Sequence, residues 1–241
     1  MPKREPRPQL DVLGVADDGQ TVFRRPLGHG EDPRWLAFEL GYLVVRPLAA
    51  SRSAQGVLTL TFQVEPSRGD PPPRSAGRAH DRGLSPGESA AAEIRQRAAA
   101  YALVTSELGL LATEFSNRTA APGRWGLPGG GIEEDEQPDD AVLREVAEET
   151  QQEVELGDLV EVQTSHWVGR SPRGTIEDFH AVRLVYAASC PAPTPPVVVD
   201  VGGTTESARW IPLAGWDTVN WTAGWREILG RRLAPPADPG R

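Results

Sequence analysis

The side chains best able to do chemistry in this sequence are acids that follow a glycine-rich loop. Residues 122–131 form that loop, residues 133–136 are all acidic, and Glu145, Glu148 and Glu149 come shortly after. Carboxylate oxygens are ligands that suit Mg²⁺ and Mn²⁺, and glycines allow a backbone to approach a ligand closely. A divalent cation acting on a phosphate is the simplest chemistry that uses both features.

A helix over Pro138–Thr150 is predicted to position the last three acids. Proline is tolerated at the first helical position, and Asp139 and Asp140 then lie at the positive end of the helix dipole. Spacing at i, i+3, i+4 and i+7 predicts a core-facing stripe opposite the three glutamates. The stripe consists of Leu143, Val146, Ala147 and Thr150. A solvated acidic face is the ordinary alternative, and the upstream glycine-rich loop favours the ligand interpretation.

This segment resembles the signature of the Nudix hydrolases, Gly-x5-Glu-x7-Arg-Glu-U-x-Glu-Glu-x-Gly-U, in which U is a bulky aliphatic residue. The matching residues are Gly130, Glu136, Arg144, Glu145, Val146, Glu148 and Glu149. The last two positions differ, because Gln151 and Gln152 stand where the signature has glycine and an aliphatic residue. A glycine there would serve as a left-handed C-cap. Either Gln151 adopts that conformation at some cost, or the helix continues past Thr150.

The resemblance implies an enzyme that hydrolyses a diphosphate linkage in a nucleoside diphosphate joined to another moiety, with Mg²⁺ or Mn²⁺ as cofactor. By position, Glu145, Glu148 and Glu149 correspond to metal ligands, with Glu136 assisting. Arg144 would orient the carboxylates by charge-assisted hydrogen bonds rather than contact the substrate. A bound cation would also allow a protein with a formal net charge of −9 to accept a phosphate substrate.

The general base stays open among Glu145, Glu148 and a further acid downstream. The candidates for that acid lie in or beside predicted loops and are Glu177, Asp178 and Glu206. Each of these three residues is more often an ordinary surface charge.

Substrate contacts are expected from the glycine-rich loop and from the segment after the signature. The expected loop contacts are Gly129, Gly130 and Gly131. Trp167 could stack on a base and His166 could hold a phosphate or a ribose, although a buried tryptophan is the plainer interpretation. Residues 162–170 match none of the patterns that separate Nudix subgroups. ADP-ribose-like compounds and nucleoside triphosphates are therefore both expected substrates.

Two other classes of function stay open. A Nudix-like domain could sense or bind a nucleotide without turnover, although a pure sensor need not keep all three glutamates of the helix. Isomerase chemistry on an isoprenoid diphosphate usually relies on a cysteine, and the only cysteine, Cys190, follows a predicted strand next to Pro191.

The composition of the chain changes at residues 66–88, which are crowded with Pro, Gly, Ser and Arg and predict a linker. Residues 1–65 are then a small, mostly β N-terminal extension, which includes a hairpin around Asp17-Asp18-Gly19. Residues 89–241 are the Nudix domain, expected as an α/β/α sandwich with a mixed sheet. A short helix is predicted over residues 89–97. The other expected elements are strands at 57–64, 101–104, 110–115, 159–162, 179–187 and 208–211 and a C-terminal amphipathic helix.

The overall composition limits the class of protein. The chain has 241 residues, and the excess of acids argues against bulk nucleic-acid or anionic-membrane binding. Without an apolar run of about 20 residues, we expect a cytoplasmic protein. Because Nudix enzymes often pair through additions such as this N-terminal extension, we also expect a homodimer. His29 and His80 belong to no recognisable group of catalytic or ligand residues. His180 falls in a strand pattern that favours a structural role.

Overall fold

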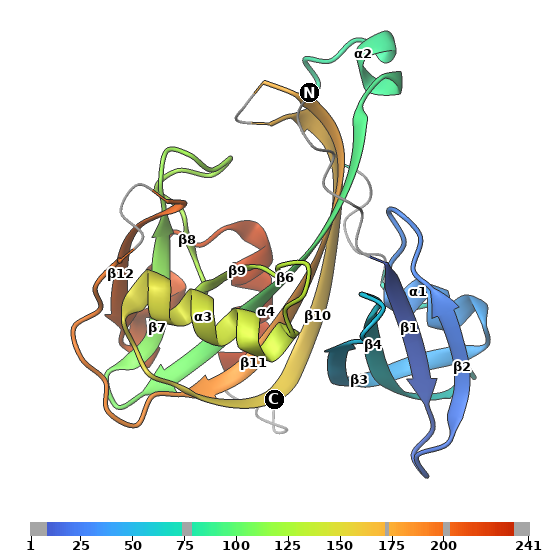
Figure 1. Cartoon of the computed structure of the whole chain (residues 1–241), viewed down its shortest axis with the longest axis horizontal. Coiled ribbons are helices and arrows are strands. Elements are labelled where there is room, and N and C mark those ends of the chain that lie inside the picture. Colours follow the sequence, from blue (N-terminus) through green and yellow to red (C-terminus); the bar gives the residue numbers. More distant parts are fainter. Residues whose placement is uncertain (1–8, 74–78, 172–173, 200–202, 234–241) are drawn as a thin grey trace, which may run out of the picture.

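The computed structural model describes residues 9–73, 79–171, 174–199 and 203–233, arranged around two β-sheets (Figure 1). The smaller sheet has the strand order β2-β1-β4-β3. Its strands are β1 (Leu10–Val15), β2 (Thr21–Pro26), β3 (Tyr42–Arg52) and β4 (Leu58–Pro66). Residues 74–78 of the predicted linker and residues 234–241 of the predicted Nudix domain lie outside the described residues.

The smaller sheet is built from two hairpins and one helix. β1 and β2 pair as an antiparallel hairpin around the predicted Asp17-Asp18-Gly19 turn, where Gly19 has a φ of +85°. β4 lies parallel to β1 and antiparallel to β3. The N-terminal extension is mostly β as predicted, but it also contains the helix α1 (Pro33–Glu39). Asp32 caps this helix by accepting a hydrogen bond from the Arg34 N–H, and Pro33 occupies its first turn.

The larger sheet is mixed, as the sequence predicts. Its strand order is β12-β7-β6-β11-β10-β5, with β8 on β7 and β9 on β6. β6–β11 and β10–β5 are parallel pairs and the other pairs are antiparallel. The strands are β5 (Ala79–His80), β6 (Glu93–Ser106), β7 (Gly109–Phe115), β8 (Trp125–Gly126), β9 (Gly129–Gly131), β10 (Glu155–Arg170), β11 (Ile176–Ser189) and β12 (Thr205–Ile211).

The glycine-rich loop fills a gap in this sheet. β6 and β7 pair only next to their turn, where Thr105 lies opposite Leu110 and Ser106 opposite Gly109. Farther along, β9 pairs with β6 and β8 pairs with β7. The loop is therefore anchored on both sides by backbone hydrogen bonds, at the level of the sheet.

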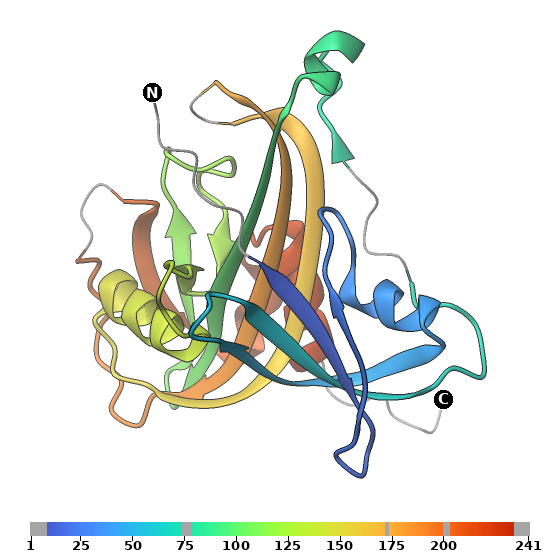
Figure 2. The ribbon, with the colours of Figure 1, turned by 45° about the vertical axis from the view of Figure 1, so that its right-hand side comes forward.

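Helices cover both faces of the larger sheet (Figures 1 and 2). α3 (Pro138–Thr150) packs Val142 and Val146 into the same apolar cluster as Ala100 and Val182 of the sheet. On the other face, α4 (Ala223–Leu233) and the 3-10 helix η1 (Leu213–Thr218) cover a second cluster. This arrangement confirms the expected α/β/α architecture.

The helix predicted over residues 89–97 is wrong. α2 covers only Pro86–Ala90, begun by a capping box between Ser85 and Glu88, and β6 already starts at Glu93. The alanines of this segment favour a helix locally, but Glu93 to Thr105 pair continuously with β11. Long-range pairing therefore overrides the local propensity.

The smaller sheet packs against the larger one beside β10 (Figures 1 and 2). Alternate residues of β4, among them Leu58, Leu60 and Phe62, are buried in the apolar cluster that also contains Val182 and Leu184 of β11. Among the described residues, no helix is both long and apolar enough to cross a bilayer. The domain boundaries, the pairing of two copies and a cytoplasmic location stay predictions.

Candidate active site

Three acids of the signature, Glu145, Glu148 and Glu149, are carried by α3, whose start is held by the smaller sheet. The N-cap residue Gln137 makes no side-chain cap bond, and Pro138 follows it at the first helical position. The Gln137 side-chain amide instead donates to the Arg52 carbonyl oxygen and its oxygen accepts from the Arg52 N–H, both at 2.9 Å. The tip of β3 thereby holds the loop that leads into the helix.

The buried face of α3 differs from the predicted stripe. Leu143 is 38% exposed and Ala147 is also exposed, so neither belongs to the core. The buried residues are Pro138, Ala141, Val142, Val146, Glu149 and Thr150. Glu149 thus lies on the inner side of the helix, and the expectation that all three glutamates share the opposite side is wrong for this residue.

Glu149 is buried because it finds polar partners inside the protein. The residue is only 7% exposed. One carboxylate oxygen accepts the Gly129 N–H at 2.9 Å, and the other accepts the hydroxyl of Thr205 on β12. A buried carboxylate with two hydrogen-bond donors is satisfied, so the helix can turn this acid toward the glycine-rich loop.

Arg144 joins the other carboxylates of the signature. Its guanidinium donates to both oxygens of Glu136, at 2.8 and 3.0 Å. The same group donates to Glu145 at 3.0 Å, to Glu148 at 3.2 Å and to the Gly131 carbonyl at 3.1 Å. These charge-assisted bonds fix the orientation of three acids at once, which is the geometry that an orienting role requires.

The glycines of the loop leave room for these side chains. A Cβ on Gly130 would lie 2.5 Å from the carboxyl atoms of Glu145. Gly129 has a φ of +141°, and a Cβ there would lie 2.3 Å from the Ala100 carbonyl oxygen. A Cβ on Gly131 would lie 2.1 Å from the Arg97 guanidinium. Gly129 is thus required by its backbone conformation and backbone contact, whereas a side chain at Gly130 or Gly131 would displace the Glu145 carboxylate or the Arg97 guanidinium.

Burial changes the ionisation of the acids on α3. Desolvation raises the pKa of Glu149 to about 7, and it also raises the pKa of Glu145. The hydrogen bonds from Arg144 instead lower the pKa of Glu136. A nearby cation favours the charged form of a carboxylate and would keep these acids ionised. Because all of the donor atoms beside Gly130 are oxygens, the group fits Mg²⁺ or Mn²⁺.

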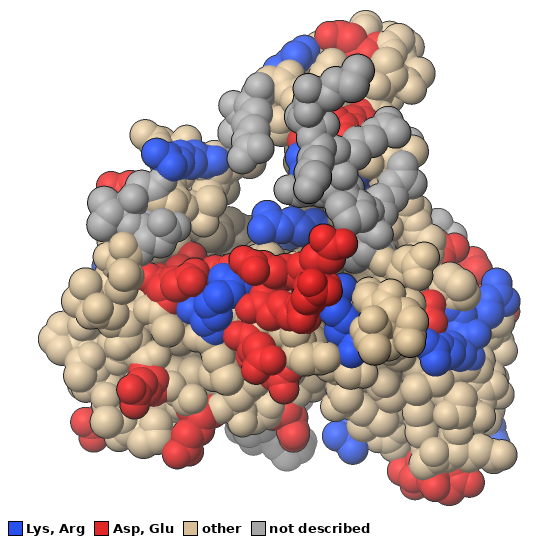
Figure 3. All heavy atoms as spheres, in the orientation of Figure 1, with Lys and Arg blue, Asp and Glu red and all other residues tan. Residues whose placement is uncertain are grey.

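An open pocket of about 1160 Å³ adjoins this acidic group. Its lining includes residues 129–131, Glu145 and Glu149. Figure 3 shows acidic side chains gathered over α3 and the loop before it, with the surface hollowed above them. Further lining residues include Arg34, Arg97, Tyr101, Phe179, Arg183 and Trp225. The pocket therefore combines carboxylates, guanidinium groups and aromatic rings.

The remaining predicted site residues lie elsewhere, and none of them is among the described residues that line this pocket. Trp167 packs against Phe179, with ring centroids 5.5 Å apart. His166 is its neighbour on β10 and so points to the opposite face of the sheet. Glu177 is buried in an ion pair with Arg95 at 3.0 Å, and Glu206 is exposed on β12.

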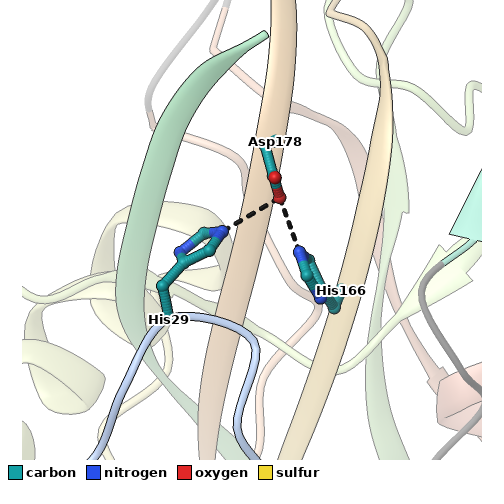
Figure 4. Close-up of side chains that lie close together, drawn as sticks. All are labelled: His29, His166 and Asp178. Atoms are coloured by element: carbon teal, nitrogen blue, oxygen red, sulfur yellow. Dashed lines mark hydrogen bonds and ion pairs between the residues drawn. The ribbon is translucent and has the colours of Figure 1, made fainter. Parts of the chain in front are cut away.

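His166 and Asp178 join a cluster that was not predicted from the sequence (Figure 4). One Asp178 oxygen lies 2.9 Å from His29 Nε2 and 2.5 Å from His166 Nε2. The fully buried His180 packs beside both imidazoles, at centroid distances of 5.6 and 6.0 Å, and its desolvation lowers the pKa to about 4. The expectation that His29 belongs to no group of potential ligand residues is therefore wrong.

Part of this cluster had a signal in the sequence. His166 and His180 are opposite each other in the β10–β11 hairpin, and they lie at equal distances from its turn. His29 had no such signal, because its loop reaches the hairpin only through the docking of the two sheets. The pocket arginines Arg97 and Arg183 and the Glu149 partner Thr205 were missed because strand pairing over long sequence distances within the larger sheet brings them to the site.

Comparison with known proteins agrees with the signature. The family model described as NUDIX domain matches residues 95–224. Among curated proteins there is no significant match.

Several solved structures resemble this chain over a little more than half of its length. The MutT protein of Methanosarcina mazei has 22% identity and a TM-score of 0.46, over 56% of this chain and 91% of that one. A MutT NUDIX hydrolase from Burkholderia pseudomallei has 25% identity and a TM-score of 0.42, over 56% and 96%. An ADP-ribose pyrophosphatase from Streptococcus suis has 17% identity and a TM-score of 0.39, over 58% and 93%.

Proposed function

The chain belongs to the NUDIX family, and from this premise we propose that it hydrolyses a diphosphate linkage in a nucleoside diphosphate joined to another moiety, with Mg²⁺ or Mn²⁺ as cofactor. The observation that supports the proposal most is the hydrogen-bond network of Arg144. It holds Glu136, Glu145 and Glu148 together beside a pocket that also contains Glu149.

The residues that would hold the cation are Glu145, Glu148 and Glu149, with Glu136 fixed behind them by Arg144. When bound, the cation would neutralise the diphosphate, polarise its P–O bonds and lower the pKa of a water molecule. Glu148 is the most accessible of these acids, since its side chain is 49% exposed against 18% for Glu145. Glu149 is held farther inside, against Gly129 and Thr205.

The other pocket residues suit the anionic and aromatic parts of such a substrate. Arg97 of β6 and Arg183 of β11 face the pocket from neighbouring strands, where guanidinium groups can hold phosphate oxygens bidentately. Tyr101 and Trp225 pack edge to face at 4.8 Å and Phe179 also lines the pocket. Aromatic walls of this kind suit a nucleobase. We leave the general base unassigned between Glu145 and Glu148.

The proposal is tested by a substrate screen with the full chain. ADP-ribose, NADH, dinucleoside polyphosphates and nucleoside triphosphates are each incubated with Mg²⁺ or Mn²⁺, and nucleoside monophosphate, phosphate and pyrophosphate are measured. We expect ADP-ribose-like compounds or nucleoside triphosphates to yield products only when the cation is present.

The alternative function, nucleotide sensing without turnover, makes a different prediction in the same screen. A sensor would bind one of these nucleotides, detectable by calorimetry, and would release no product with either cation. That result would overturn the hydrolase proposal.

A further inference from the structure

Three ligand-type side chains converge where the loop after β2 meets the β10–β11 hairpin (Figure 4). We propose that His29, His166 and Asp178 bind a divalent transition-metal ion of the zinc type, at a site separate from the acids of α3. Among the described residues, these three form the one group of His, Cys, Asp or Glu side chains whose ligand atoms all lie within 4.8 Å of one another.

The spacing of the three ligand atoms is close to what such an ion requires. The two imidazole Nε2 atoms approach the same Asp178 oxygen, at 2.9 and 2.5 Å. Zinc ligands lie about 2.0–2.2 Å from the metal, and hence roughly 3.3–3.6 Å from one another in a tetrahedron. The Asp178 oxygen would therefore have to move only about 1 Å or less farther from each nitrogen to admit a coordinated ion.

The surroundings show a site built by the fold. Gly30 lets the loop lie close against the hairpin, since a Cβ there would lie 2.7 Å from the His166 ring and would displace it. Gly30 also has a φ of +78°, a conformation that favours glycine. The ligand side chains are between 15% and 19% exposed, so an ion and a solvent ligand can reach them. His180 forms the wall behind them, so three of the four histidines in the chain gather here.

The donor set distinguishes this site from the acids of α3. Two imidazole nitrogens and one carboxylate oxygen suit Zn²⁺, Co²⁺ or Fe²⁺, whereas a set of carboxylates alone suits Mg²⁺ or Mn²⁺. The two sites should therefore differ in metal preference. Bound metal would also join residue 29 of the N-terminal extension to strands of the larger sheet, and so stabilise the docking of the two sheets.

The same geometry has an explanation without metal, in which two neutral imidazoles each donate an Nε2–H to Asp178. This alternative predicts a purely hydrogen-bonded cluster that has no affinity for zinc. The experiment must therefore detect imidazole ligation itself rather than activity.

The test measures Zn²⁺ and Co²⁺ binding to the full chain after chelator treatment, in a Glu148→Gln/Glu149→Gln background that weakens the acids of α3. X-ray absorption of bound zinc and visible absorption of bound cobalt report on imidazole ligands. We expect binding of one equivalent, with imidazole ligation, weakened by roughly tenfold or more in His29→Gln and His166→Gln, since even outer-shell substitutions have effects of this size.

A matched control is available in His80, which is exposed on β5 and pairs with Val168 of β10. His80→Gln should bind zinc as the parent does. Circular dichroism of each variant in chelator shows whether it is folded, and Asp178→Asn provides a second variant if a histidine substitution disturbs the loop. Zinc affinity that is equal in the parent and in folded His29→Gln and His166→Gln, or ligation by oxygen alone, would overturn the proposal.

Discussion

The acids on α3 and the histidine cluster differ in how the chain assembles them. The first group lies between Glu136 and Glu149, on one helix and the loop before it, and a single arginine holds three of its members. The second group joins His29 to Asp178, which is 149 positions away in the sequence. It exists only because a hairpin register and the docking of two sheets bring three segments together. Local spacing can therefore reveal the first kind of site and not the second.

The two groups also differ in chemistry. Carboxylates beside an open pocket suit a hard cation and a phosphate substrate, whereas two imidazoles and one carboxylate suit a transition metal. If this contrast is correct, substitutions in one group should leave the metal affinity of the other unchanged. The following predictions test that independence, from the largest expected effect to the smallest.

Glu148→Gln and Glu149→Gln should lower turnover by about 10²-fold or more, because each removes a charged ligand from the proposed cation site. Turnover is measured as product release from the best substrate of the screen, and far-UV circular dichroism checks the fold. Glu134→Gln removes the same charge from an exposed position in the preceding loop and should leave turnover unchanged. Wild-type turnover in both site variants would remove the carboxylate mechanism.

Gly130→Ala should lower turnover by about tenfold or more, because the new Cβ displaces the Glu145 carboxylate, which lies only 2.5 Å from its position. Steady-state kinetics with saturating Mg²⁺ measures this effect. Gly87→Ala adds a Cβ where none of the surrounding atoms is within 4 Å and serves as the control. Unchanged kinetics in Gly130→Ala would mean that Glu145 need not occupy its observed position.

Glu161→Gln should lower the free energy of unfolding by about 1–2 kcal/mol, because it weakens a charged junction between three parts of the molecule. The buried Glu161 of β10 binds Arg34 of α1 and Arg231 of α4. Urea denaturation measures the loss, and Glu155→Gln, at an exposed position of the same strand, is the control.

Glu161→Gln also tests whether the two proposed metal sites depend differently on the docking of the N-terminal extension. Weaker docking of the N-terminal extension should lower zinc affinity at His29 and leave Mg²⁺ affinity at α3 nearly unchanged. A loss of Mg²⁺ affinity with unchanged zinc affinity would show that the α3 site depends more on docking than the histidine cluster does.

Gln151→Gly should raise the free energy of unfolding by up to about 1 kcal/mol, because Gln151 ends α3 in the left-handed conformation that glycine adopts without strain. Its φ is 54°, and its backbone N–H donates to the Ala147 carbonyl. Urea denaturation measures the gain, with Gln151→Ala as a control that keeps the strain. Turnover should not change, since the position lies beyond the acids. A destabilised Gln151→Gly would contradict this account of the helix end.

The sequence was informative where one element sets the geometry. The bounds of α3 at Pro138 and Thr150 follow from the proline, the acids of its first turn and the helical spacing. The side of the helix occupied by Glu149 could not be predicted in this way, because it depends on donors from Gly129 and Thr205. Similarly, β6 replaces a predicted helix because its partner β11 is far away in the sequence.

The most direct test of the central claim is hydrolysis of the best substrate in ¹⁸O-labelled water with Mg²⁺, followed by mass spectrometry of the products. If water attacks phosphorus and breaks the P–O–P linkage, one ¹⁸O atom enters one of the two phosphate-bearing products, and Glu148→Gln gives almost no labelled product. Products that carry no label on either phosphate, or equal labelling by wild type and Glu148→Gln, would contradict the account.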